Sequence, residues 1–146
     1  RGRVALLLGS REDARVFFGT ALELAQARFS ESPNQYGMWV LTRGLVEAAA
    51  FDDLRGEREL ATQRYAEARK WSTELLEGEA ASKRFTLVRL EALSGLESRA
   101  DQDGQPEAGA RLHEERCRIA RAFQDRDGED VRFLQHDCQV VPQGKE

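Results

Sequence analysis

The sequence predicts an all-α protein in which antiparallel helix hairpins stack into a solenoid, and three observations lead to this prediction. Three glycines each lie nine residues before a ring-bearing side chain, in the pairs Gly9 with Phe18, Gly56 with Tyr65, and Gly104 with His113. Between these glycines, apolar residues recur at steps of three and four, which is the periodicity of a helix. The chain has only three prolines, and its β-branched residues form no alternating runs of the kind found in strands. A unit of 47 to 48 residues therefore occurs about three times, and such units bury their apolar faces by stacking.

The register of the repeat continues after each ring. Small residues lie five positions after the glycines, at Ala14, Ala61 and Gly109. Twelve positions after the glycines come Ala21, Ala68 and Arg116, and fifteen positions after them come Leu24, Trp71 and Ile119. The third copy departs from the first two, because His113 takes the place of an aromatic residue and Arg116 that of an alanine.

The first expected helix spans residues 12–29, where Ala14, Phe18, Ala21 and Ala25 share one face. Residues 30–34 end it, because Pro33 lacks the amide that a helix interior needs. A second helix is expected over residues 36–51, closed by residues 52–56. The third spans residues 57–76, and Gly78 follows it as a left-handed cap.

The second half of the chain repeats this alternation. A fourth helix is expected over residues 82–97, and residues 99–106 form the clearest polar loop. The fifth spans residues 107–123, and residues 124–129 form the next loop. A shorter helix over residues 130–140 is stopped by Pro142.

Length and composition limit the classes of function. We expect residues 1–146 to form a single repeat domain, because a repeat array has one continuous core. The net charge of −4 is mild, and no dense basic stripe is present to follow a phosphate backbone, so nucleic acid is an unlikely partner class. No apolar run approaches the roughly 18 residues of a membrane span. Two cysteines are too few for a disulfide framework, so we expect a cytoplasmic protein.

The N-terminal residues suggest that the chain is part of a longer polypeptide. The sequence begins with Arg1, and the apolar run from Val4 to Leu8 follows almost at once. This run is too short to span a bilayer, and no small-residue cleavage site of a secretory signal follows it. We therefore expect a fragment cut near the end of a helix.

The pattern of glycine, small residue, aromatic residue and small residue resembles the second half of a tetratricopeptide repeat (TPR). Pro33 looks like the proline that ends the repeat, although the family period is about 34 residues. The excess corresponds to close to two turns added to each helix, at about 3.6 residues per turn. The loop of Pro33 and Asn34 followed by Trp39 is similar to that of long-helix arrays in bacterial multidomain signalling proteins.

The resemblance implies a right-handed solenoid that binds a protein or peptide along the concave face lined by the first helix of each repeat. It implies no catalysis and no cofactor. Arg43 and Arg89 lie in first helices, four residues after Trp39 and Phe85, where they can offer fork-shaped donors to a carboxylate of a partner. The expected partner-binding residues are Trp39, Arg43, Glu47, Lys83 and Arg89.

Two alternatives stay open beside this interpretation. Arg43 and Arg89 can lie on a solvated helix face, with intrahelical pairs such as Arg43 with Glu47. The whole array can also be structural, packing against its own chain or self-associating without a separate ligand. Trp39 is equally compatible with groove lining and with packing between helices, whereas Trp71 is expected in the core.

His113 and Cys117 lie four residues apart on one expected helix face, and a hairpin can bring Cys138 near Cys117. Zinc needs about four converging ligands, and only three can converge here, so no metal is expected. The favoured interpretation has His113 in an aromatic packing position and both cysteines as small core residues. Whether the cysteines pair is left open. No side chain has a recognisable base beside it, so no catalytic residue is expected.

Overall fold

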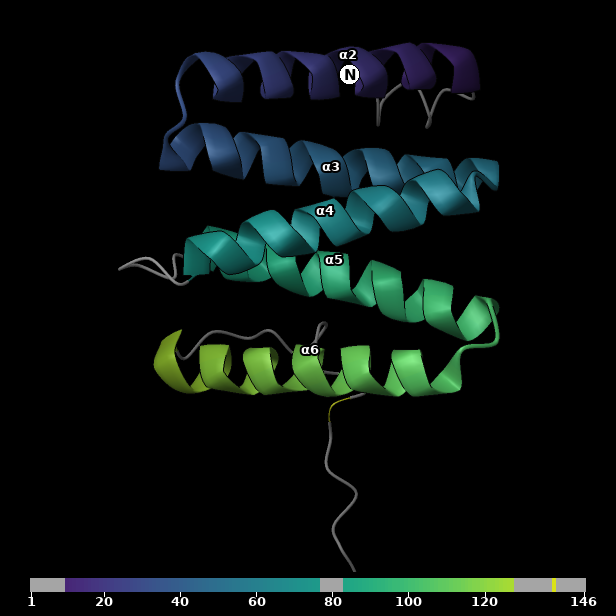
Figure 1. The fold of residues 1–146 in the computed structure, drawn as a ribbon, viewed down its shortest axis with the longest axis vertical. Helices are drawn as coiled ribbons and strands as arrows, with labels where there is room; N and C mark the ends of the chain where they lie inside the picture. Colours follow the sequence, from purple (N-terminus) through teal and green to yellow (C-terminus); the bar gives the residue numbers. More distant parts are fainter. Residues whose placement is uncertain (1–9, 77–82, 128–137, 139–146) are drawn as a thin grey trace, which may run out of the picture.

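The described part of the computed structural model comprises residues 10–76, 83–127 and Cys138, and it contains helices and no strand. Its five helices are α2 (Arg11–Glu31), α3 (Gln35–Arg55), α4 (Arg58–Leu76), α5 (Lys83–Gln102) and α6 (Pro106–Asp127). Successive helices run in opposite directions and lie side by side in chain order (Figure 1). Beyond these neighbour contacts, α3 also touches α5. The prediction of an all-α chain of stacked helices is confirmed for these residues.

Local sequence signals set the helix ends. The Asn34 side chain caps α3 by accepting a hydrogen bond from the Gly37 amide at 2.8 Å. Gly56 ends the same helix with φ of 77°, and Gly104 follows α5 with φ of 67°. Both values lie in the left-handed region that glycine adopts without steric cost. Pro106 then occupies the first position of α6, where the missing amide costs nothing.

Two expected loops are partly helical instead. Helix α5 continues through Gln102, whereas a loop was predicted from residue 99, and α6 continues to Asp127, whereas a loop was predicted from residue 124. Arg99 and Ala100 are buried in the last turn of α5, and Arg99 forms an ion pair with Asp53 of α3. Tertiary contacts therefore keep a polar stretch helical.

Several predictions lie outside the described residues: the apolar run before Gly9, Gly9 itself, the cap at Gly78, and most of the expected helix over residues 130–140. Within that last range Cys138 is described, and it is not helical. Among the described residues, no helix is both long enough and apolar enough to cross a membrane.

One face of α4 lies at the centre of the core. Ala61, Tyr65, Ala68 and Ser72 recur at steps of four, three and four, and all are buried. They pack between the apolar faces of α3 and α5, which contribute Leu41, Leu45, Val46, Ala48, Ala49, Val88, Ala92 and Leu96. Small residues at many of these positions let the helices approach closely. The expectation that Trp71 packs in the core is confirmed in part, because its half-buried ring meets Phe29 edge to face, with centroids 5.5 Å apart.

Tyr65 of α4 lies directly against the backbone of Gly95 of α5. A Cβ atom placed on Gly95 would lie 2.4 Å from the Tyr65 ring, which is closer than real Cβ contacts allow. Any larger residue at position 95 would therefore push α4 and α5 apart. The Tyr65 ring is 6% exposed and lies where the α3–α4 hairpin meets the α5–α6 hairpin.

Replacing Tyr65 should test this junction. We expect Tyr65→Ala to lower the free energy of unfolding by about 2–5 kcal/mol, as for loss of a large buried side chain. The control is Tyr36→Ala, because Tyr36 is 68% exposed and its loss should cost about 0.5 kcal/mol or less. Urea melts followed by circular dichroism measure both values. Equal losses for the two variants would contradict the assigned junction.

Candidate functional site

A groove of about 360 Å³ runs between α3 and α5, over the edge of α4. We call it the α3/α5 groove. Residues of α3 form one wall, residues of α5 form the other, and Tyr65 lies at its floor. Its lining consists of Val46, Glu47, Ala50, Asp53, Tyr65, Glu91, Ser94, Gly95 and Ser98.

The charged atoms that line the groove are hydrogen-bond acceptors. Glu47 and Asp53 come from α3, and Glu91 comes from α5. Burial raises the pKa of Asp53, although the charge of Arg99 and a hydrogen bond from Tyr65 act in the opposite direction. Arg99 Nη1 lies 3.2 Å from Asp53 Oδ1, yet this buried oxygen has no hydrogen bond within the described residues. Burial and the charge of Asp53 in turn raise the pKa of Tyr65 to about 12, so the floor of the groove stays a neutral hydroxyl.

Arg43 lies beside this groove, and both of its terminal nitrogens are engaged. Nη2 donates to Glu47 on the same helix, and Nη1 donates to Glu91 on α5, each at 2.5 Å. The intrahelical pair of Arg43 with Glu47 that the sequence left as an alternative is thus present. Its second pair, to Glu91, was not anticipated, and it ties α3 to α5.

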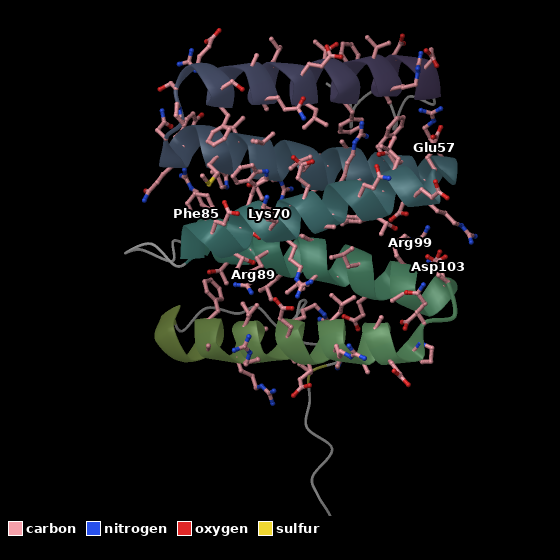
Figure 2. The ribbon with its side chains drawn as sticks, in the orientation of Figure 1. Glu57, Lys70, Phe85, Arg89, Arg99 and Asp103 are labelled. Atoms are coloured by element: carbon pink, nitrogen blue, oxygen red, sulfur yellow. A yellow bond between two sulfur atoms is a disulfide. The ribbon has the colours of Figure 1, made fainter. Side chains whose placement is uncertain are left out.

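Arg89 lies on a different side of α5, between α5 and α6 (Figure 2). Its side chain is 14% exposed, and Nη2 donates to Glu115 of α6 at 2.8 Å. Arg69 of α4 donates to the other oxygen of Glu115. One carboxylate therefore joins three helices, and the structure does not bring Arg43 and Arg89 onto one surface.

The two remaining expected partner-binding residues, Trp39 and Lys83, lie near the N-terminal ends of α3 and α5. Trp39 is half-buried against the core, with the Arg84 guanidinium 5.4 Å from its ring centre and the Tyr36 ring 6.0 Å away. This placement combines packing with partial exposure. Lys83 is the first residue of α5, and its side chain lies outside the described part of the chain.

Glu91, the second carboxylate partner of Arg43, was not predicted from the sequence. Its signal was available in the repeat register, because Arg43 and Glu91 are 48 residues apart and so occupy equivalent positions in successive units. Opposite charges at equivalent positions of stacked units attract one another along the array. Gly95, Ser94 and Ser98 carried no comparable signal.

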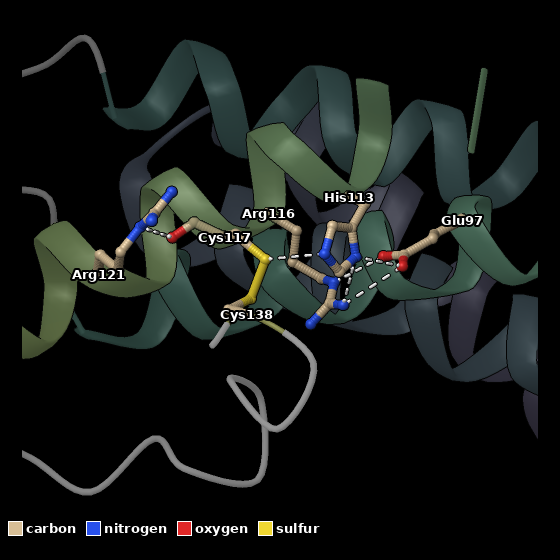
Figure 3. Close-up of a disulfide and its surroundings, with 6 residues drawn as sticks. All are labelled: Glu97, His113, Arg116, Cys117, Arg121 and Cys138. Carbon is tan, nitrogen blue, oxygen red and sulfur yellow. Dashed lines mark hydrogen bonds and ion pairs between the residues drawn. A yellow bond between two sulfur atoms is a disulfide. The ribbon is translucent and has the colours of Figure 1, made fainter. Parts of the chain in front are cut away.

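A second polar cluster lies on α6, at the far end of the described array (Figure 3). Cys117 and Cys138 form a disulfide with an S–S distance of 2.04 Å and a Cα–Cα distance of 5.3 Å. The pairing that the sequence left open is therefore present. Cys117 is buried, as expected of a core residue, whereas Cys138 is partly exposed. His113 is also partly exposed, and its Nδ1 lies 2.7 Å from Glu97 Oε1. Within the described residues, no three metal-binding side chains form a group able to hold a metal ion.

None of the family models, curated proteins and solved structures compared with the chain matches it. Its function is therefore inferred from the α3/α5 groove and the polar clusters.

The Glu115 cluster should make stability depend on pH in the acidic range. Burial acts to raise the pKa of Glu115, but hydrogen bonds and charge from Arg89 and Arg69 outweigh it and hold the pKa below the ordinary 4.5. A carboxyl with a lowered folded-state pKa contributes stability above its unfolded pKa, and this contribution is lost as pH falls through the folded-state pKa. We expect Glu115→Gln to unfold more easily at neutral pH and to lose less stability on acidification than the unmodified chain.

Urea melts at a series of pH values between about 7 and 3 measure this slope. The control is Glu114→Gln, which changes an exposed carboxylate on the same helix and should keep the original slope. If Glu115→Gln and the unmodified chain lose stability in parallel, Glu115 does not carry the acid sensitivity.

Proposed function

We propose that this chain is a protein–protein interaction module: a TPR-like scaffold or sensor arm that binds a protein or peptide in the α3/α5 groove. The observation that carries the proposal is the groove itself, which is formed by two helices from successive hairpins and has an aromatic floor. The proposal includes a right-handed solenoid and a place in a larger bacterial signalling protein, both of which rest on the resemblance of the sequence.

The order of helix contacts supports a TPR-like arrangement. In such an array each first helix touches the next first helix, and second helices cover the opposite side. Here α3 contacts α5, while α4 packs against both of them and carries the repeat residues Ala61, Tyr65 and Ala68 on its buried face. Contacts that skip one helix leave a surface between α3 and α5 on which an extended segment can lie.

The lining of the groove favours a partner that donates hydrogen bonds. Glu47, Glu91 and Asp53 present carboxylates, and Ser94 and Ser98 add hydroxyl groups. Arg43 and Arg99 partly balance the carboxylates, so the surface remains mixed in sign rather than strongly acidic. A peptide with lysine or arginine side chains complements such a surface better than the acidic partner expected from Arg43 and Arg89. The arrangement offers recognition, and we propose no enzymatic activity for the groove.

A cytoplasmic location is also part of the proposal, and the disulfide bears on it. Disulfides are rare in cytosolic proteins, where those that form are usually transient or redox-sensing. A cytoplasmic chain would therefore hold the bond between Cys117 and Cys138 only under oxidising conditions.

The binding proposal is tested by filling the groove. A displayed library of random peptides is selected on the purified chain, and we expect the enriched peptides to carry basic side chains and to compete for one site. Ala50→Trp places an indole in the groove from an exposed position of α3, so it should abolish their binding. The matched control is Ala66→Trp on an exposed position of α4 outside the groove lining, which should bind as before.

Two outcomes would contradict the proposal. One is a selection that enriches no peptide, and the other is a set of peptides that bind the Ala50→Trp variant with unchanged affinity. Circular dichroism of both variants checks that the helices are intact.

One observation favours the alternative function, an array that packs against its own chain or self-associates. Helix α2 exposes a second apolar face, on which Val16 is 52%, Phe17 39% and Leu24 65% exposed. The buried face of the same helix carries Ala14, Leu22 and Ala25. A helix that is apolar on two sides is typical of an element packed between two neighbours.

Substitution on α2 distinguishes this alternative. If the chain self-associates through α2, light scattering should find an oligomer that Leu24→Glu converts to a monomer. The control is Leu54→Glu, because Leu54 is 70% exposed at the end of α3 and should not alter the oligomer. A monomeric unmodified chain would rule out self-association and leave packing against other parts of the same polypeptide.

A further inference from the structure

The disulfide lies at the end of a chain of polar contacts that ordinary structural disulfides do not need. Cys117 Sγ is 3.5 Å from His113 Nε2, and His113 Nδ1 is 2.7 Å from Glu97 Oε1 (Figure 3). Glu97 Oε2 accepts a second hydrogen bond, from Arg116 Nε at 2.7 Å. Sulfur, imidazole and carboxylate thus follow one another within hydrogen-bonding distance, with both imidazole nitrogens in use.

The helices hold this arrangement in place. His113 and Cys117 are one helical turn apart on α6, so their side chains share a face. Glu97 reaches them from α5. Its carboxylate accepts a hydrogen bond from Arg116 of α6, which fixes its position. Burial acts to raise the pKa of Glu97, but hydrogen bonds from Arg116 and His113 dominate and hold it below the ordinary range. The carboxylate therefore stays ionised and orients the imidazole.

The two sulfur-bearing residues differ in access. Cys117 is 4% exposed, whereas Cys138 is partly exposed. A thiolate from solution can therefore approach the sulfur of Cys138 more easily than that of Cys117. Attack at Cys138 makes Cys117 the leaving sulfur, and a leaving thiolate departs faster when its thiol pKa is low.

The charged groups around Cys117 act on its thiol in both directions. His113 Nε2 lies where it can donate a hydrogen bond to a Cys117 thiolate, and Arg116 adds positive charge beside the imidazole. Arg121 lies on the next turn and donates to the backbone oxygen of Cys117. Burial of Cys117 opposes ionisation of its thiol. The carboxylate of Glu97 pairs with both His113 and Arg116, so it offsets part of their effect on the thiol. Cysteines paired with a histidine in other proteins have thiol pKa values well below about 8.5.

We propose that Cys117–Cys138 is a thiol-exchange site, in which His113 and Glu97 make Cys117 a good leaving sulfur, rather than a permanent cross-link. The co-reactant is a small monothiol of the glutathione type. Its thiolate attacks Cys138 Sγ, the bond between the two protein sulfurs breaks, and Cys117 leaves as a thiolate beside His113. A second thiolate then attacks the mixed disulfide at the small-molecule sulfur, which frees Cys138. The protein disulfide gains two electrons and two protons in total, and two small thiols become one small disulfide.

The first test measures the two thiols in the reduced chain. After reduction with excess dithiothreitol and its removal without air, each cysteine is alkylated with iodoacetamide at a series of pH values and quantified by mass spectrometry. We expect the thiol pKa of Cys117 to be about one unit or more below the ordinary 8.5. It should also be lower than the thiol pKa of Cys138 in the same molecule. A Cys117 thiol pKa at or above that of Cys138 would overturn the proposal without the need for any variant.

The second test uses His113→Gln, which removes the imidazole beside Cys117 at a partly exposed position. It should raise the Cys117 thiol pKa and slow reduction of the disulfide by reduced glutathione, on the order of threefold for each unit of pKa. The control is Glu114→Gln, which alters a neighbouring charge on the exposed side of α6 and should leave both values unchanged. If His113→Gln keeps its helical signal and both values match those of the unmodified chain, the disulfide is structural only.

Discussion

The contact between the Tyr65 ring and the backbone of Gly95 is the constraint on which much of the structure depends. It sets the separation of α4 and α5, since a Cβ atom at position 95 would meet the ring at 2.4 Å. The same ring touches the core formed by α3, so three helices are positioned around one side chain. The ring and Gly95 also line the α3/α5 groove, so the same contact helps to shape it.

Arginine side chains then connect the helices around this junction. Arg43 links α3 to α5, Arg99 links α5 to α3, and Arg89 links α5 to α6. Each guanidinium has several hydrogen-bond donors in a fixed geometry, so it can donate to one carboxylate or to two at once. The arginines that would recognise a partner are thus occupied inside the array. Under the proposed function, the surface left for a partner is the α3/α5 groove, whose lining carboxylates favour a basic peptide rather than an acidic one.

The two ends of the described array differ in character. At one end, helix α2 carries exposed apolar residues, an arrangement typical of a surface that contacts a neighbour. Helix α6 ends the array with a polar cluster in which His113, Glu97 and Arg116 satisfy one another beside the Cys117–Cys138 disulfide. The third repeat carries histidine and arginine where the earlier repeats carry an aromatic residue and alanine, and these polar replacements build the cluster.

Local and periodic properties were determined by the sequence alone. The steps of three and four, the break at Pro33, and the placement of Gly56 and Gly104 in the loops predicted the type and approximate ends of the described helices. The cap formed by Asn34 and the positive φ of both glycines became visible only in the structure. The burial of Ala61, Tyr65 and Ala68 agrees with the repeat register. In the first copy the register holds less well, since Ala21, at the position equivalent to Ala68, is exposed.

Contacts between distant residues were decided only by the tertiary structure. The extra helical turn at Arg99, the direction of Arg89 toward α6 rather than a groove, and the pairing of Cys117 with Cys138 each depend on a partner far along the chain. Periodicity predicts which face of a helix is buried. An arginine or cysteine near the edge of that face can still point toward one neighbouring helix or toward another. The choice is made by where Asp53, Glu115 and Cys138 lie in space, and spacing along one helix carries no information about that.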